Sequence, residues 1–103
     1  DISLMDFTTI LSVDYAAKAI VERWKLRFPR EKKTARVKDA VRSETIDVLY
    51  KLEEIEVVEN VTENLNRIVV QDDPQDPTRL NVRIPADIVN GLHVIGGIID
   101  LYL

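Results

Sequence analysis

Hydrophobic residues recur with helical spacing in the first third of the chain. From residue 12 to residue 28 they return every three or four positions and share one helix face: Val13, Ala16, Ala17, Ile20, Trp24 and Phe28. The hydroxyl of Ser12 can cap the first turn, and Pro29 disfavours helical geometry in the residue before it. The pattern therefore predicts a helix over residues 12–28, after a weakly patterned entry segment at residues 1–11.

The same spacing returns between residues 34 and 54, where Thr34 is placed to cap the first turn. The apolar stripe of this second segment consists of Val37, Val41, Val48, Leu52 and Ile55. A helix of this length spans roughly 30 Å. Because only a short charged segment separates the two helices, we expect them to form an antiparallel hairpin.

After residue 56 the pattern becomes that of strands. We predict a strand over residues 67–72, a turn rich in aspartate and proline, and a second strand over residues 79–84 that ends at Pro85. In the second strand Leu80, Val82 and Ile84 share one face, whereas Arg79, Asn81 and Arg83 share the other. Residues 57–58 form a short strand-like pair, and residues 62–66 are compatible with one helical turn or a loop.

The last strand is predicted over residues 92–102 and has apolar residues on both faces. Gly96 and Gly97 in its middle indicate a bulge or a close backbone approach. Because an undocked terminus frays, a chain end this apolar is either paired within its own sheet or made for a neighbouring chain.

These elements predict an α+β fold, in which an antiparallel helical hairpin packs on one face of a small, mainly antiparallel β-sheet. A length of 103 residues corresponds to one domain over residues 1–103. Because the chain does not begin with methionine, we expect it to be a fragment of a longer chain. No apolar run reaches the roughly 20 residues of a membrane helix, so no membrane insertion is expected.

Charge is distributed unevenly along the chain. The segment from Lys18 to Arg42 has ten basic and three acidic residues, a net charge of +7, whereas the remainder has four basic and fifteen acidic residues, a net charge of −11. The basic surface suits an acidic protein, another copy of the chain, or nucleic acid, and it also suits a merely solvated helix. The net charge of −4 makes nucleic acid the less favoured partner.

Residues that could carry chemistry are sparse. His93 lacks a neighbouring second imidazole, and the acidic turn at Asp72, Asp73 and Asp76 lacks the spacing of a calcium loop. The sequence has no cysteine, no nucleophile elbow and no glycine-rich phosphate loop. We therefore assign no catalytic, cofactor-binding or metal-binding residue, expect no cofactor or small-molecule substrate, and do not expect an enzyme.

Three segments of the last third of the chain stand out in order: residues 76–82 (DPTRLNV), residues 84–92 (IPADIVNGL) and the apolar end at Tyr102–Leu103. Together they resemble the C-terminal domain of contractile-tail sheath proteins of Mu-like bacteriophages. Earlier similarities lie at residues 8–15, 28–30 and 58–60. The loop after Pro29 is shorter than is usual in this family, and Gly96–Gly97 replaces bulkier residues.

The resemblance implies a structural subunit that stacks as rings around a tail tube and drives the tube outward on contraction. It implies two kinds of partner, other sheath subunits and the tube protein, in a virion tail assembled in the cytoplasm of a bacterial host. The expected contact with the tube or another subunit is the basic group Arg27, Arg30, Lys32, Lys33 and Arg36. The expected inter-subunit strand contains Leu92, Val94, Ile98, Leu101, Tyr102 and Leu103.

A second hypothesis is a small nucleic-acid-binding or regulatory domain that uses the basic helical hairpin. A third is a self-contained structural module with no role in assembly. Salt-dependent binding to duplex DNA distinguishes the second hypothesis from the others, because phosphate contacts weaken steeply with ionic strength.

Overall fold

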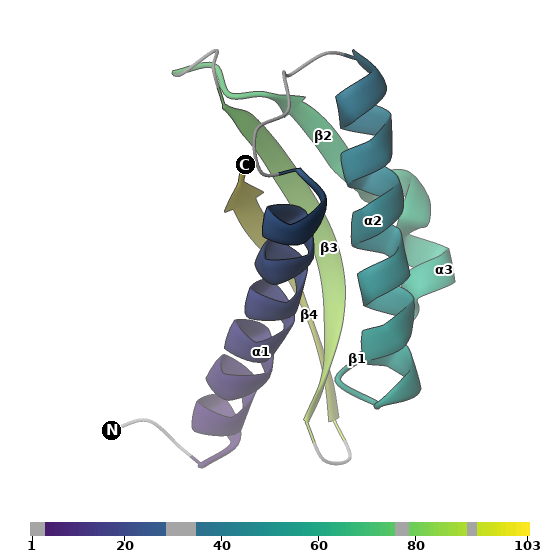
Figure 1. Cartoon of the computed structure of the whole chain (residues 1–103). Coiled ribbons are helices and arrows are strands. Elements are labelled where there is room, and N and C mark those ends of the chain that lie inside the picture. Colours follow the sequence, from purple (N-terminus) through teal and green to yellow (C-terminus); the bar gives the residue numbers. More distant parts are fainter. Residues whose placement is uncertain (1–3, 29–34, 76–78, 91–92) are drawn as a thin grey trace.

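The computed structural model describes residues 4–28, 35–75, 79–90 and 93–103 (Figure 1). The helical elements are α1 (Leu4–Arg27), α2 (Ala35–Glu54), the short α3 (Val61–Asn64) and a 3-10 turn η1 (Leu65–Arg67). The strands are β1 (Val58–Glu59), β2 (Val69–Asp72), β3 (Leu80–Asn90) and β4 (His93–Tyr102). Helices α1 and α2 run antiparallel over one face of an antiparallel sheet, which confirms the α+β prediction.

Helix α1 begins at Leu4, so the prediction of an entry segment at residues 1–11 was wrong for the residues described. No proline or glycine interrupts residues 4–11, and a helix that has already nucleated extends readily through such a segment. Ile10 and Leu11 are about half exposed (47% and 52%), so these two residues add little to the core and leave little periodic signal. The predicted cap Thr34 lies outside the described residues.

Strand β3 is the centre of the sheet and pairs with all three other strands. Strand β4 follows one edge of β3 over its whole length, from Asn81↔Tyr102 to Asn90↔His93. The other edge is shared end to end: β2 pairs with residues 80–83 and β1 with residues 87–88. The short α3–η1 segment connects β1 to β2 beside this edge.

Pro85 does not end the strand, contrary to the sequence prediction, because β3 continues to Asn90. The amide of Val89 donates to the carbonyl of Val57, so the odd-numbered amides of β3 point toward the β1–β2 edge. Residue 85 falls in the interval between β2 and β1, where neither strand pairs with β3. A proline here removes no ladder hydrogen bond, which explains why the strand tolerates it.

One further strand boundary differs from the predictions, and one of the two interpretations of the glycine pair is excluded. Strand β2 begins at Val69 and not at residue 67, because Arg67 belongs to η1. Gly96 and Gly97 pair in regular register with Asp87 and Ala86, so the pairing with β3 contains no bulge at the glycine pair. Of the two interpretations of these glycines, only a close approach by another backbone therefore remains.

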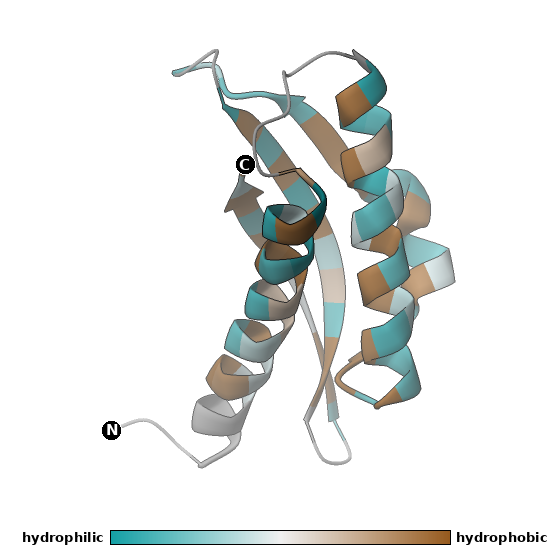
Figure 2. Ribbon diagram, viewed as in Figure 1, coloured by the Kyte–Doolittle hydropathy of each residue, from teal (hydrophilic) through white to brown (hydrophobic). Residues whose placement is uncertain are grey.

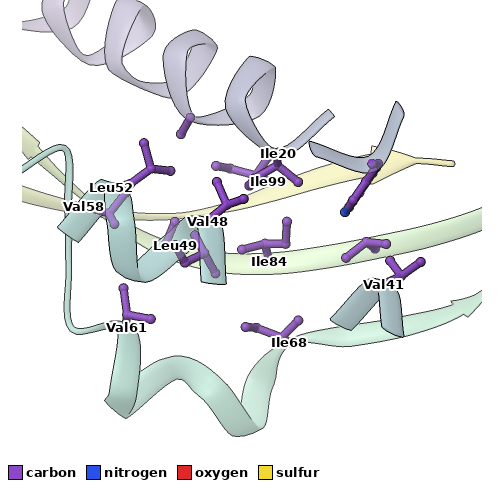
Figure 3. Close-up of a cluster of buried hydrophobic side chains, with 14 of the residues drawn as sticks. Ile20, Val41, Val48, Leu49, Leu52, Val58, Val61, Ile68, Ile84 and Ile99 are labelled. Carbon is purple, nitrogen blue, oxygen red and sulfur yellow. The ribbon is translucent and has the colours of Figure 1, made fainter. Parts of the chain in front are cut away.

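The core lies between the helices and the even-numbered side chains of β3 over residues 80–88, which are buried: Leu80, Val82, Ile84, Ala86 and Ile88. Figure 2 shows the alternation of hydrophobic and hydrophilic residues along this strand. Ile20 of α1, Val48 of α2 and Ile99 of β4 converge on Ile84 in Figure 3. The predicted stripes of both helices are largely buried, but Ile55 lies just past the end of α2 and is 57% exposed.

A buried hydrogen bond joins the two long helices. The indole Nε1 of Trp24 donates to Oγ1 of Thr45 at 3.0 Å, and Thr45 Oγ1 donates to the carbonyl of Val41 at 2.7 Å. Trp24 and Thr45 are essentially inaccessible to solvent. Because an unpaired indole N–H would be costly in this position, the pair fixes the axial register of α1 against α2.

Candidate interaction surfaces

The two described residues of the predicted basic contact, Arg27 and Arg36, lie at one end of the helical hairpin. Arg27 is the last residue of α1, and Arg36 is the second residue of α2. Both residues are exposed, and Arg27 forms one ion pair at 3.4 Å with Glu44. Arg30, Lys32 and Lys33 lie outside the described residues. The antiparallel helices thus bring the two described members of the basic group to the same end of the domain (Figure 1).

Several other basic residues of the hairpin already have partners within the domain. Arg23 binds Glu44 at 2.8 Å and Asp47 at 2.7 Å, Lys38 binds Asp72 at 3.2 Å, and Arg42 donates to the carbonyl of Leu65 at 2.7 Å. The hydrogen bonds that Arg23 donates to Asp47 and to Glu44 raise the pKa of its guanidinium. These cations therefore connect α2 to α1, to η1 and to β2, and the excess of positive charge available to a partner is smaller than the sequence implies.

The predicted inter-subunit strand corresponds to β4, whose side chains divide between the two faces of the sheet. Val94, Ile98 and Tyr102 are exposed on the face away from the helices, by 46%, 57% and 52%. We call this surface the open face. Leu101 and Leu103 point to the helix side and pack against the core. Leu92 lies outside the described residues.

The C-terminal residue is paired within the domain. The amide of Leu103 donates to the carbonyl of Leu80 and the amide of Leu80 donates to the carbonyl of Leu103, both at 3.0 Å. In an antiparallel ladder, bonded and non-bonded pairs alternate. The odd-numbered residues of β4 therefore bond to β3, whereas the backbone groups of Val94, Gly96, Ile98, Asp100 and Tyr102 point away from it.

The outer edge of β4 has no strand partner within the described part of the chain. It is ten residues long, contains no proline or lysine, and has Asp100 as its one acid. Edge strands in monomeric proteins are usually short, or protected by proline, lysine or bulges. The edges presented by β1 and β2 are only two and four residues long. Strand β4 is thus the one extended, unprotected edge among the described residues.

Polar side chains lie close together on the open face near the C-terminal end of β4. The guanidinium of Arg79 binds the buried carboxylate of Asp73 through Nε at 3.3 Å and through a terminal nitrogen at 3.1 Å, and lies 4.7 Å from the centre of the Tyr102 ring. Arg83 binds Asp100 at 3.2 Å across the β3–β4 pair. The carboxylates considered for a cation, Asp72 and Asp73, are thus bound by Lys38 and Arg79. Asp76 lies outside the described residues.

A hydrophobic groove that the sequence did not predict lies between α1 and α2. It measures about 480 Å³, and its lining includes Tyr15, Leu26 and Ile55, each of which is more than half exposed to solvent. Leu26 lies outside the apolar stripe that was predicted for residues 12–28. The groove is a consequence of helix pairing and has no signature in either helix alone.

His93 is exposed at the start of β4, and the described residues contain no group of three or more potential ligands suited to a metal ion. None of the described helices has the length and hydropathy required to cross a bilayer.

An α+β domain with one long, unprotected strand edge among its described residues, and with Arg27 and Arg36 exposed at one end of its helical hairpin, presents surfaces suited to contact with other proteins. The family model of the phage tail sheath C-terminal domain matches residues 1–101. The chain therefore belongs to this family and is a structural component of a phage tail sheath. No curated protein and no solved structure matched in the corresponding comparisons.

Proposed function

We propose that this chain is the C-terminal part of a longer sheath subunit from a contractile tail of the Mu-like kind. In this proposal the subunits stack as rings around the tail tube, after assembly in the cytoplasm of a bacterial host. Contraction rearranges the subunits and drives the tube outward. The domain carries no catalytic step in this process, because its contribution is to hold neighbouring subunits together while they move.

The observation that carries the proposal is the unprotected outer edge of β4. Its outward backbone groups offer hydrogen bonds to one further strand, and Val94 and Ile98 offer apolar contacts beside them. A strand supplied by a neighbouring subunit would extend the sheet without disturbing the core, since Leu101 and Leu103 remain packed inside. The exposed part of the predicted inter-subunit strand is thus Val94, Ile98 and Tyr102.

We further propose that the basic end of the hairpin contacts an acidic surface of the tube or of the next subunit. Arg27 and Arg36 support this role among the described residues, and the family match supports self-association in a tail. Contacts between different patches of identical subunits generate open polymers or rings, which is the symmetry that a sheath requires.

Negative-stain electron microscopy of the complete subunit at high protein concentration tests the proposal. The expected result is hollow cylinders with a regular ring repeat. A dispersed monomer that binds duplex DNA, with affinity that falls steeply as salt rises, would instead establish the nucleic-acid hypothesis.

A further inference from the structure

The middle of β4 has a gap in its side chains on the open face. Gly96 lies there between the exposed side chains of Val94 and Ile98. Across the strand pair its partner is Asp87, and the carboxylate Oδ1 of Asp87 lies 3.3 Å from the position that a Cβ on Gly96 would occupy. Gly96 is therefore the point at which the outer edge of the sheet has direct access to a carboxylate one strand further in.

The carboxylate of Asp87 is oriented by a residue outside β3 and β4. Oδ2 accepts a hydrogen bond of 2.8 Å from Nδ2 of Asn60, which has a left-handed backbone conformation (φ 58°). Oδ1 receives no hydrogen bond from the described residues. Glu59, which is exposed and pairs with Asp87 on the other side, adds a second negative charge to the same row.

The dimensions of a sheet determine what can reach this carboxylate. Neighbouring strands lie about 4.8 Å apart, so a strand added to the edge of β4 would lie roughly 10 Å from β3. A long side chain opposite Gly96 can span that distance because glycine places nothing in its path. Arginine or lysine fits best, since the apolar stem would pack between Val94 and Ile98 and the charged end would bind a carboxylate.

We propose that an extended segment of a second sheath subunit pairs with the outer edge of β4 and extends a cationic side chain across Gly96 to Oδ1 of Asp87. This inference rests on the strand addition proposed above and specifies its register. If the incoming strand were shifted along β4 by one residue, its cationic side chain would lie on the other face of the sheet. A shift by two residues would place that side chain over Val94 or Ile98. The glycine gap thus selects one alignment of the incoming strand.

Assembly of the complete subunit, measured by sedimentation and negative-stain microscopy, tests the inference. Gly96→Leu fills the gap, and Asp87→Asn removes the charge while keeping an acceptor for Asn60. We expect each change to raise the protein concentration needed for assembly by roughly tenfold, the effect of losing one charge-assisted hydrogen bond. Asp87→Asn should also make assembly less sensitive to salt.

Matched controls are available at neighbouring positions. Gly97→Ala changes the adjacent glycine, where an added Cβ meets nothing within 4 Å, and Glu63→Gln neutralises an exposed carboxylate on α3. Both controls should assemble like the wild type. Gly96→Ala is the milder variant if Gly96→Leu fails to fold, and Asp87→Asn tests the contact without adding volume.

The outcomes separate this inference from the proposed function. If the wild type forms cylinders and the Gly96 and Asp87 variants do so at the same concentration, the cationic contact is wrong and the sheath function stands. If the wild type itself forms no cylinders, the sheath proposal fails, and the contact that depends on it fails as well.

Discussion

Leu103 and Leu80 exchange two backbone hydrogen bonds of 3.0 Å, which anchors the last residue of the chain to the first residue of β3. The apolar C-terminus is therefore integrated into the sheet of its own domain along one edge while its other edge is exposed. The same strand can thus stabilise the fold and offer an interface, and mutations can separate these two roles.

Removal of Leu101–Leu103 should destabilise the folded domain, so that any effect on assembly is a consequence of impaired folding. The deletion removes two side chains that pack against the core and the hydrogen bonds between residues 80 and 103. We expect the free energy of unfolding to fall by roughly 3 kcal/mol. Urea denaturation followed by circular dichroism measures this loss. A truncated domain with wild-type stability would show that the pairing at residue 103 contributes little.

Ile98→Lys should have the opposite effect, because it should prevent assembly while the stability of the fold stays nearly unchanged. The side chain at residue 98 is 57% exposed on the open face, and its backbone N–H points away from β3. A lysine in the middle of an edge strand discourages pairing with another strand. We expect a melting temperature within a few degrees of the wild type and no polymers by electron microscopy. Cylinders of normal length from this variant would exclude the outer edge of β4 as the inter-subunit strand.

Thr45→Val should destabilise the helical hairpin by about 1–3 kcal/mol, because it leaves the indole N–H of Trp24 without an acceptor in a dry site. Thr45→Ser keeps the hydroxyl and is the matched control, with a smaller loss from the missing methyl group. Since Trp24 is the one tryptophan of the chain, its fluorescence reports unfolding directly. Equal stability of the valine and serine variants would contradict a structural role for this hydrogen bond.

The ion pair of Asp47 should contribute to acid sensitivity. Hydrogen bonds from Arg23 and then from Lys51 hold the pKa of Asp47 below its ordinary value of 3.8. Because the folded-state pKa is lowered, the stabilisation is present above pH 3.8 and is lost as pH falls through the folded-state pKa. Melting temperatures of the wild type and Asp47→Asn should therefore converge as pH falls below 3.8. If the difference in melting temperature between the wild type and Asp47→Asn stayed constant down to the pH at which the protein unfolds, the ion pair of Asp47 would be excluded as a cause of acid sensitivity.

Charge reversal at the basic end should weaken assembly if that end contacts an acidic surface. One variant combines Arg27→Glu with Arg36→Glu. A second variant combines Arg30→Glu, Lys32→Glu and Lys33→Glu. Exposed Lys18, toward the middle of α1, provides the control Lys18→Glu. We expect fewer and shorter cylinders for both variants and no change for the control, with the effect reduced at high salt. Equal assembly of all three variants would argue that the basic end is only solvated.

Local sequence patterns predicted the helices and their antiparallel pairing, because burial of one helix face requires apolar residues at a spacing of three or four. They failed where the outcome depended on a neighbour. Pro85 normally signals the end of a strand, but β3 continues through it because no strand pairs with that side of residue 85. The start of α1 was missed because Ile10 and Leu11 are about half exposed and leave little periodic signal.

The sequence by itself determined that the chain is an α+β domain, that its last residues are too apolar to remain undocked, and that its basic residues are concentrated in the helical hairpin. Tertiary structure alone decided which side of β4 is paired, which cations are neutralised within the domain, and that Gly96 lies beside Asp87. The physical reason is that the periodic spacing of hydrophobic residues is a property of positions close together in the chain. A free strand edge, an ion pair and a gap between side chains on paired strands depend instead on residues that are distant in sequence.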